Sequence, residues 1–116
     1  MKKSALAASG TTETYPTRPM KELFEAVLAI EDSKEAAKFF RDLLTTAELA
    51  EFANRWQMVK LLRQGKPYTA IARELKTSTA TVTRVAHWLF NGMGGYQLIA
   101  DRTLPTKRKN PSDKIA

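Results

Sequence analysis

Several residue types are scarce in this chain of 116 residues, and each scarcity excludes a class of site. The absence of cysteine excludes disulfides, thiolate metal sites and a cysteine nucleophile. His87 is the single histidine, so a multi-histidine metal site is excluded. The five glycines form no phosphate-binding loop, and no carboxylate cluster or nucleophile–base pair suggests an enzyme. No apolar run approaches the roughly 18 residues that cross a bilayer. The sequence therefore predicts a small, reduced, cytoplasmic protein without catalytic activity, a metal site or a membrane span.

Positive charge is unevenly distributed along the chain, whose net charge is +7. Residues 55–84 hold seven basic residues against Glu74, a balance of +6, whereas residues 19–54 have a balance of −4. Residues 1–18 and 103–116 are basic as well, by +2 and +3. A concentration of positive charge favours polyanionic partners, and nucleic acid first. Charge alone leaves open a solvated basic face that has no partner.

The apolar pattern is helical, and we expect an all-α fold. Large apolar residues recur at spacings of three and four in residues 22–30, 33–44 and 45–65. Period-two alternation is absent over any long segment. The threonine-rich stretch 77–83 is the main risk to this interpretation, since β-propensity alone favours a strand there.

Local signals mark where the expected helices begin and end. Ser33 is predicted to cap the second helix, because a hydroxyl accepts hydrogen bonds from the free amides of the first turn. Thr45 and Glu48 have the Thr-x-x-Glu spacing of a capping box, which predicts the start of a long third helix. Gly65 suits the left-handed position after that helix, and Pro67 follows it.

The same signals define one domain between two tails. Residues 1–18 are rich in small and polar types, and residues 103–116 contain the K-R-K run, so both are predicted to be disordered tails. The domain then covers residues 19–102. We expect it to close with a short helix over 96–102 that packs two aliphatic residues into the core, Leu98 and Ile99.

The most informative stretch is 71–84, I-A-R-E-L-K-T-S-T-A-T-V-T-R. Its first half places apolar atoms on one face of a short helix, at Ile71, Ala72 and Leu75. Ser78 is a strong N-cap for the next helix, in which Val82, Val85 and Leu89 would point into the core. Two helices joined by such a short turn form a helix-turn-helix, here about residues 67–90, whose second helix enters the DNA major groove.

The residues expected to face outward suit DNA. The short side chains of Thr79, Ala80 and Thr83 let a helix approach the base edges, and Arg84 can bind guanine or a phosphate. Other polar residues are placed to bind phosphates, together with the free amides after Ser78. The predicted DNA contacts are Thr69, Arg73, Lys76, Ser78, Thr79, Ala80, Thr81, Thr83 and Arg84.

Two observations qualify this prediction. Helix-turn-helix arrangements also serve as packing or protein-interaction motifs, so a module without specific DNA binding is the alternative. Lys76 stands where such turns usually carry glycine, which predicts a left-handed lysine at a cost of about 1 kcal/mol.

Residues 20–102 resemble the Trp-repressor-like bacterial proteins. The similarity includes L-T-T-A-E-L at 44–49 and S-T-A-T-V-T-R at 78–84. The runs L-F-N-G-M-G-G-Y at 89–96 and L-I-A-D-R at 98–102 are similar to the C-terminal signature of the YerC/YecD branch. The resemblance implies an all-helical, intertwined homodimer that regulates transcription, usually as a repressor, by binding double-stranded DNA. Large aromatic residues independently offer apolar surface for a dimer, namely Phe24, Phe39, Phe40, Phe52 and Trp56. The alternative is that they fill the core of a single chain.

The resemblance also implies a possible corepressor site. Trp repressors hold an amino acid between two arginines, which fall here on Arg55 and Arg84. Val85 follows where those proteins keep a small residue, and Trp88 lies close to the same space. These two side chains argue against tryptophan as the ligand, so another small molecule, such as a different amino acid, and no ligand at all remain open.

Overall fold

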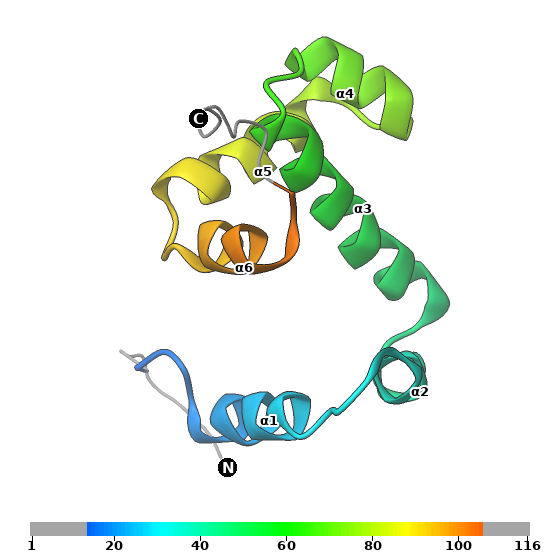
Figure 1. The fold of residues 1–116 in the computed structure, drawn as a ribbon, viewed down its shortest axis with the longest axis vertical. Coiled ribbons are helices and arrows are strands. Elements are labelled where there is room, and N and C mark those ends of the chain that lie inside the picture. Colours follow the sequence, from blue (N-terminus) through cyan, green and yellow to red (C-terminus); the bar gives the residue numbers. More distant parts are fainter. Residues whose placement is uncertain (1–13, 106–116) are drawn as a thin grey trace. The chain divides into compact units, whose positions relative to one another are not determined.

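The computed structural model describes residues 14–105 of the chain. They form six helices (Figure 1): α1 (Arg18–Leu28), α2 (Ser33–Leu43), α3 (Thr46–Arg63), α4 (Tyr68–Leu75), α5 (Thr79–Asn91) and α6 (Gly95–Thr103). The described residues contain no strand, and the threonine-rich stretch supplies the start of α5, so the expected all-α fold is confirmed. The two predicted tails lie largely outside the described residues. At their inner ends, Arg18 already belongs to α1 and Thr103 to α6.

The helices divide into two compact units, one ending at Thr45 and the other beginning at Thr46. In the first unit, the hydroxyl of Thr17 caps α1 by accepting the backbone N–H of Met20. The cap of α2 differs from the expectation, because Asp32 rather than Ser33 accepts the N–H of Glu35, at 2.9 Å. An aspartate one residue earlier competes successfully, since its carboxylate also favours the positive end of the helix. None of the described side chains on α1 or α2 is buried.

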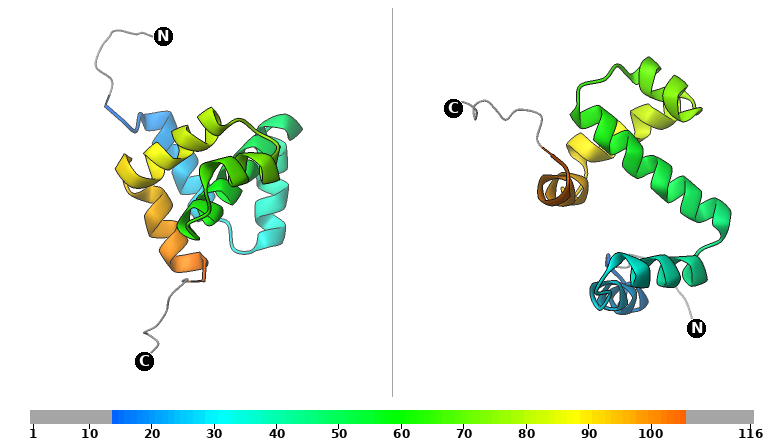
Figure 2. Two further views of the ribbon diagram at one scale, coloured as in Figure 1. Left: turned by 90° about the horizontal axis from the view of Figure 1, so that it is seen from above. Right: turned by 45° about the vertical axis from the view of Figure 1, so that its right-hand side comes forward.

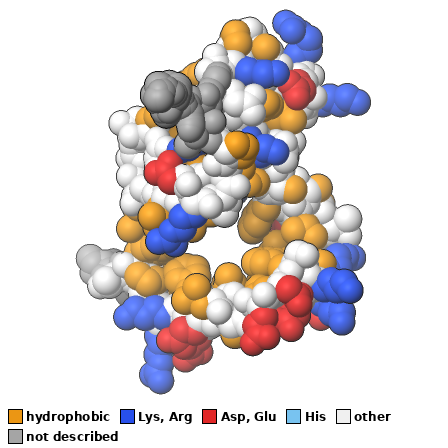
Figure 3. Space-filling model, in the orientation of Figure 1, with side chains coloured by type: hydrophobic (Ala, Val, Ile, Leu, Met, Phe, Trp, Pro, Cys, Tyr) orange, Lys and Arg blue, Asp and Glu red, His pale blue; other side chains and the backbone are white. Residues whose placement is uncertain are grey.

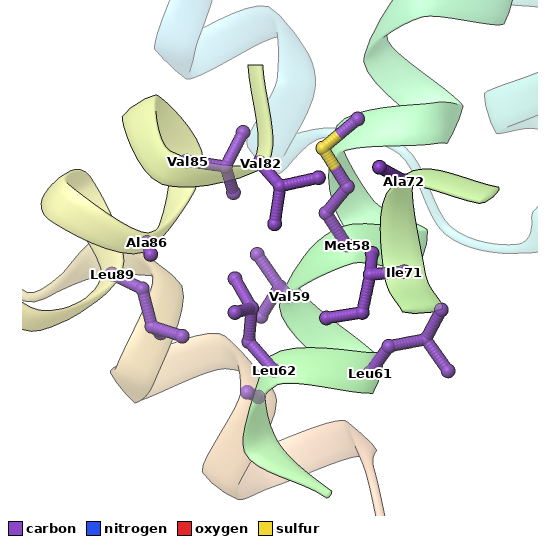
Figure 4. Close-up of a cluster of buried hydrophobic side chains, with 11 residues drawn as sticks. Met58, Val59, Leu61, Leu62, Ile71, Ala72, Val82, Val85, Ala86 and Leu89 are labelled. Carbon is purple, nitrogen blue, oxygen red and sulfur yellow. The ribbon is translucent and has the colours of Figure 1, made fainter. Parts of the chain in front are cut away.

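The second unit is built around the C-terminal half of α3, where α4, α5 and α6 gather (Figures 1 and 2). Figure 4 shows the apolar side chains that meet there, with Met58 and Val59 of α3 facing Ile71 of α4 and Val82 of α5. The expected inward residues of the helix-turn-helix are confirmed, since Ile71, Ala72, Val82, Val85 and Leu89 are all buried.

The closing helix packs differently from the expectation. It begins at Gly95, and Ala100 is its fully buried residue, whereas the side chains of Leu98 and Ile99 are 50% and 42% exposed. The apolar side chains at 98 and 99 therefore point away from the core of this unit. Their exposure within a single chain leaves apolar surface available to a partner.

Candidate nucleic-acid interface

The turn between α4 and α5 has the geometry of a helix-turn-helix. Lys76 ends α4 in the left-handed conformation, with φ 58° and ψ 49°. The backbone N–H of Thr77 donates to the carbonyl of Ala72 at 2.9 Å, which closes the end of α4. Ser78 then caps α5, its hydroxyl accepting the N–H of Thr81 at 3.1 Å. The left-handed lysine and the serine cap were both expected from the sequence, and the structure confirms them.

Burial separates the two sides of α5. Its inner side contributes Val82, Val85, Ala86 and Leu89 to the core. The predicted DNA contacts lie on the other side and on the neighbouring part of α4. Eight of the nine are exposed, namely Thr69, Arg73, Lys76, Ser78, Thr79, Ala80, Thr83 and Arg84. The helix-turn-helix thus presents short side chains and cations to solvent, free of cover by the described residues of its own unit.

Thr81 is the ninth predicted contact and differs from the rest. Its side chain is half-buried, and its hydroxyl oxygen lies 3.0 Å from the hydroxyl of Ser78. The hydroxyl is therefore engaged in the cap of α5.

Positive charge on this surface is largely uncompensated. Within residues 14–105, no carboxylate lies within 4.0 Å of the cationic atoms of Arg73, Lys76 or Arg84. Glu74 is the one acidic residue of 55–84, and its Oε1 lies 3.6 Å from Nζ of Lys66. Figure 3 shows basic side chains on either side of acidic surface at the top of the view, where α4 lies. A surface of this kind attracts polyanions.

A cavity of about 430 Å³ lies behind the start of α5. Both sequence-predicted ligand residues, Arg55 of α3 and Arg84 of α5, line it. Val85 and Trp88 line it as well, so the structure places in this cavity the two side chains that argue against tryptophan as the ligand. The remaining lining residues are Glu51, Asn54, Met58, Thr77, Thr81 and Tyr96.

The sequence predicted none of these six remaining residues as part of a ligand site, and two of them, Glu51 and Tyr96, make contacts that shape the cavity. Glu51 forms an ion pair with Arg55, with Oε2 2.9 Å from Nη2, and the guanidinium of Arg55 also lies 5.5 Å from the centre of the Phe52 ring. The spacing of four between Glu51 and Arg55 in a helix was a usable signal for that pair. Tyr96, by contrast, reaches the cavity only because α6 folds back onto α3, and its ring lies 6.4 Å from that of Trp56.

Within residues 14–105, no group of three or more His, Asp or Glu side chains could hold a metal ion. None of the helices in residues 14–105 is long and apolar enough to pass through a lipid bilayer.

Comparison with known proteins gives consistent matches. A sequence model of the Trp repressor protein family matches residues 18–104. YerC of Bacillus subtilis (strain 168), a protein of uncharacterised function, is 34% identical over 95 residues, which cover 82% of this chain and 91% of YerC.

Two solved structures are similar in fold as well as in sequence. The TrpR-like protein of Eubacterium eligens ATCC 27750 is 33% identical with a TM-score of 0.74, covering 80% of this chain and 96% of that one. A candidate Trp repressor of Staphylococcus aureus is 39% identical with a TM-score of 0.68, covering 72% of this chain and 84% of that one.

Proposed function

We propose, given that this chain belongs to the Trp repressor family, that it is a sequence-specific regulator of transcription that binds double-stranded DNA and acts as a repressor. Trp repressors are regulatory proteins rather than enzymes, and so is this member. The observation that carries the proposal is the solvent-facing start of α5, where short side chains stand beside unpaired cations. A protein of this function works in the bacterial cytoplasm, on the nucleoid when bound to DNA.

Each exposed residue then has a role. Thr79, Ala80 and Thr83 enter the major groove and contact base edges or thymine methyl groups, while Arg84 binds guanine or a phosphate. A second set holds the phosphate backbone and sets the register without reading sequence, namely Thr69, Arg73, Lys76, Ser78 and Thr81. Ser78 and Thr81 have the least support in this set, because their hydroxyls already bond to each other and that of Ser78 also caps α5.

We further propose that the functional form is a homodimer. The unburied side chains of α1 and α2 support it, because an isolated pair of helices with an exposed apolar face is poorly stable in water. Leu28 is 82% exposed and Phe24 is 40% exposed, and in the other unit Phe90 is 58% exposed. A second copy would cover such surfaces and place two reading helices roughly 34 Å apart, one turn of DNA.

The oligomeric state is measured by size-exclusion chromatography coupled to light scattering. We expect twice the chain mass at micromolar concentration, and a shift towards the chain mass for Leu28→Glu. Glu22→Gln, on the charged side of α1, is the control and should leave the dimer intact. A wild-type protein that elutes at the chain mass would refute the dimer.

DNA binding is tested first with random duplex. At about 50 mM salt we expect binding that weakens steeply as salt increases, because phosphate contacts release condensed counterions. Selection from a random pool should then enrich one sequence with a clear preference over the starting pool. Failure to bind duplex at low salt would favour the alternative function, a helix-turn-helix module that binds a protein.

Small-ligand binding is a second candidate function, supported by the cavity beside α5. Its volume falls within the range of ligand sites, and Arg84 offers it a cation that no described carboxylate neutralises. Arg55 is less available, since Glu51 already pairs with it. The proposed ligand class is a small amino acid acting as corepressor. Titration calorimetry with the twenty amino acids, with Arg84→Ala as the control variant, tests this, and the absence of heat with all of them would reject it.

A further inference from the structure

The direction of α6 is weakly determined by the backbone that leads into it. Gly92, Gly94 and Gly95 occupy the turn after α5, and Gly94 has φ +90°. No side chain caps the first turn of α6. Glycines restrict the chain least, so this turn permits many directions for the helix that follows. Ala100 is the single buried residue of α6, and Tyr96 packs against the core while only partly buried, so the apolar area that holds this helix in place is small.

A polar contact with α3 supplies what the turn lacks. Arg63, the last residue of α3, places Nη1 2.7 Å from Oε1 of Gln97 and 2.9 Å from Oδ1 of Asp101. Gln97 and Asp101 are four residues apart and therefore share one face of α6. The side chain of Arg63 is 20% exposed and that of Asp101 is 67% exposed, so solvent screens the ion pair, and the bond to the partly buried Gln97 is the more protected of the two. We call these three residues the α6 clamp.

The helix held by the clamp packs behind the proposed reading helix. α6 contacts α5 as well as α3, and its Ala100 lies in the same buried cluster as Ala86 and Leu89 of α5. Tyr96, next to Gln97, packs its ring against Trp56 of α3 and lines the cavity together with Arg84 and Val85 of α5. A displacement of α6 would therefore change the support of α5 directly.

We propose that the α6 clamp fixes the orientation of α5 on α3 and so controls base-specific recognition. The inference rests on the proposed binding of α5 in the major groove. Base contacts depend on the placement of each side chain at a base edge, whereas phosphate contacts come from flexible cations and tolerate small rotations. Loosening the clamp should thus reduce binding to a preferred sequence and spare binding to random duplex. Arg63, Gln97 and Asp101 are positioning residues, since none of them needs to touch DNA.

Asp101→Asn is the sharpest test, because it should change the affinity for a preferred duplex without a matching change in the affinity for a random duplex. The probes are the duplex enriched by selection and a random duplex of equal length. Removing one negative charge leaves affinity for random duplex unchanged or slightly higher, while affinity for the enriched duplex falls by about threefold to tenfold. Asp42→Asn on α2 is the matched control, since it makes the same charge change at an exposed residue of the other unit, and it should preserve the preference.

Two further variants guard against loss of folding as the explanation. Gln97→Met removes one acceptor without a charge change and should lower the sequence preference in the same direction. Exchanging the charges in the double variant Arg63→Asp with Asp101→Arg should recover part of the preference that either single change loses. All measurements are made well below the unfolding temperature of each variant, with the folded fraction followed by circular dichroism.

The outcomes separate the two levels of the proposal. An unchanged preference in Asp101→Asn, or a parallel loss on both duplexes, would overturn the positioning role of the clamp and leave DNA binding intact. A wild-type protein with no preference for any duplex would overturn the proposed function itself, and the clamp inference with it.

Discussion

Ser78 and Thr81 are joined twice at the start of α5. The hydroxyl of Ser78 accepts the backbone N–H of Thr81 at 3.1 Å, and the two hydroxyl oxygens lie 3.0 Å apart. The cap satisfies a free amide of the first turn and holds the end of the helix that is proposed to enter the groove. One short contact thus links the stability of α5 to its function.

Replacing Ser78 tests the cap. Ser78→Ala should lower the free energy of unfolding by about 1 kcal/mol, because the first turn loses its side-chain acceptor. Urea unfolding followed by circular dichroism measures it. Ser33→Ala is the control, because Asp32 caps α2 and the change at 33 should cost well under half as much. Equal losses in the two variants would show that Ser78 contributes no cap.

Substitutions of Arg84 and Thr83 test whether the exposed side of α5 contacts DNA bases. Arg84→Ala should weaken binding to the enriched duplex about fivefold or more, as expected for a base contact worth about 1–3 kcal/mol, and Thr83→Ala should weaken it less. Neither change should alter the urea midpoint, since both side chains are exposed. Lys38→Ala on α2 removes one exposed positive charge in the other unit and is the control. If Arg84→Ala bound the enriched duplex like wild type, the assignment of α5 to the groove would be wrong.

Two substitutions of Lys76 distinguish the effect of its left-handed backbone on stability from the effect of its charge on DNA binding. Lys76→Gly should stabilise the protein by up to about 1 kcal/mol, because glycine adopts the left-handed conformation without a Cβ penalty. Lys76→Ala should not, since alanine keeps the penalty. Both variants should bind enriched and random duplex more weakly by similar factors, as expected when a phosphate contact is removed. A variant that gained stability and kept full DNA affinity would remove Lys76 from the interface.

Gly92 after α5 and Gly95 at the start of α6 form a matched pair of glycines. A Cβ at Gly92 would clash with the carbonyl oxygen of Trp88, whereas one at Gly95 would meet nothing within 4 Å. Gly92→Ala should therefore lower the free energy of unfolding by about 1–3 kcal/mol, because the last turn of α5 must shift. Gly95→Ala should be close to neutral. Thermal and urea unfolding of both variants checks this, and similar stabilities would show that the turn accommodates the methyl group.

The site was predictable where the signals were local. The cap at Ser78, the left-handed Lys76 and the buried positions of α5 follow from side chains within a few residues of one another. The exposure of the predicted contacts followed from the same periodicity, because a helix that buries one face in the core leaves its opposite face exposed to solvent. Their contact with DNA stays a prediction, as do the domain limits at 19–102.

Two expectations were wrong. In one, two neighbouring residues were both suitable as a helix cap, and in the other, helix packing decided which side chain is buried. Asp32 and Ser33 can each cap a helix, and the sequence alone does not show which of the two residues precedes the first helical turn. Leu98 and Ile99 were expected in the core because they are apolar, yet the rotation of α6 buries Ala100 instead.

The sequence was sufficient to predict the helices, the turn between α4 and α5, and the kind of surface that this turn presents, because those depend on contacts close along the chain. Helix packing was needed to bring Arg55, Arg84 and Tyr96 to one cavity and to place Arg63 beside Asp101. Those contacts join residues far apart in the chain, and they depend on how helices rotate and cross when they pack, which local patterns leave open.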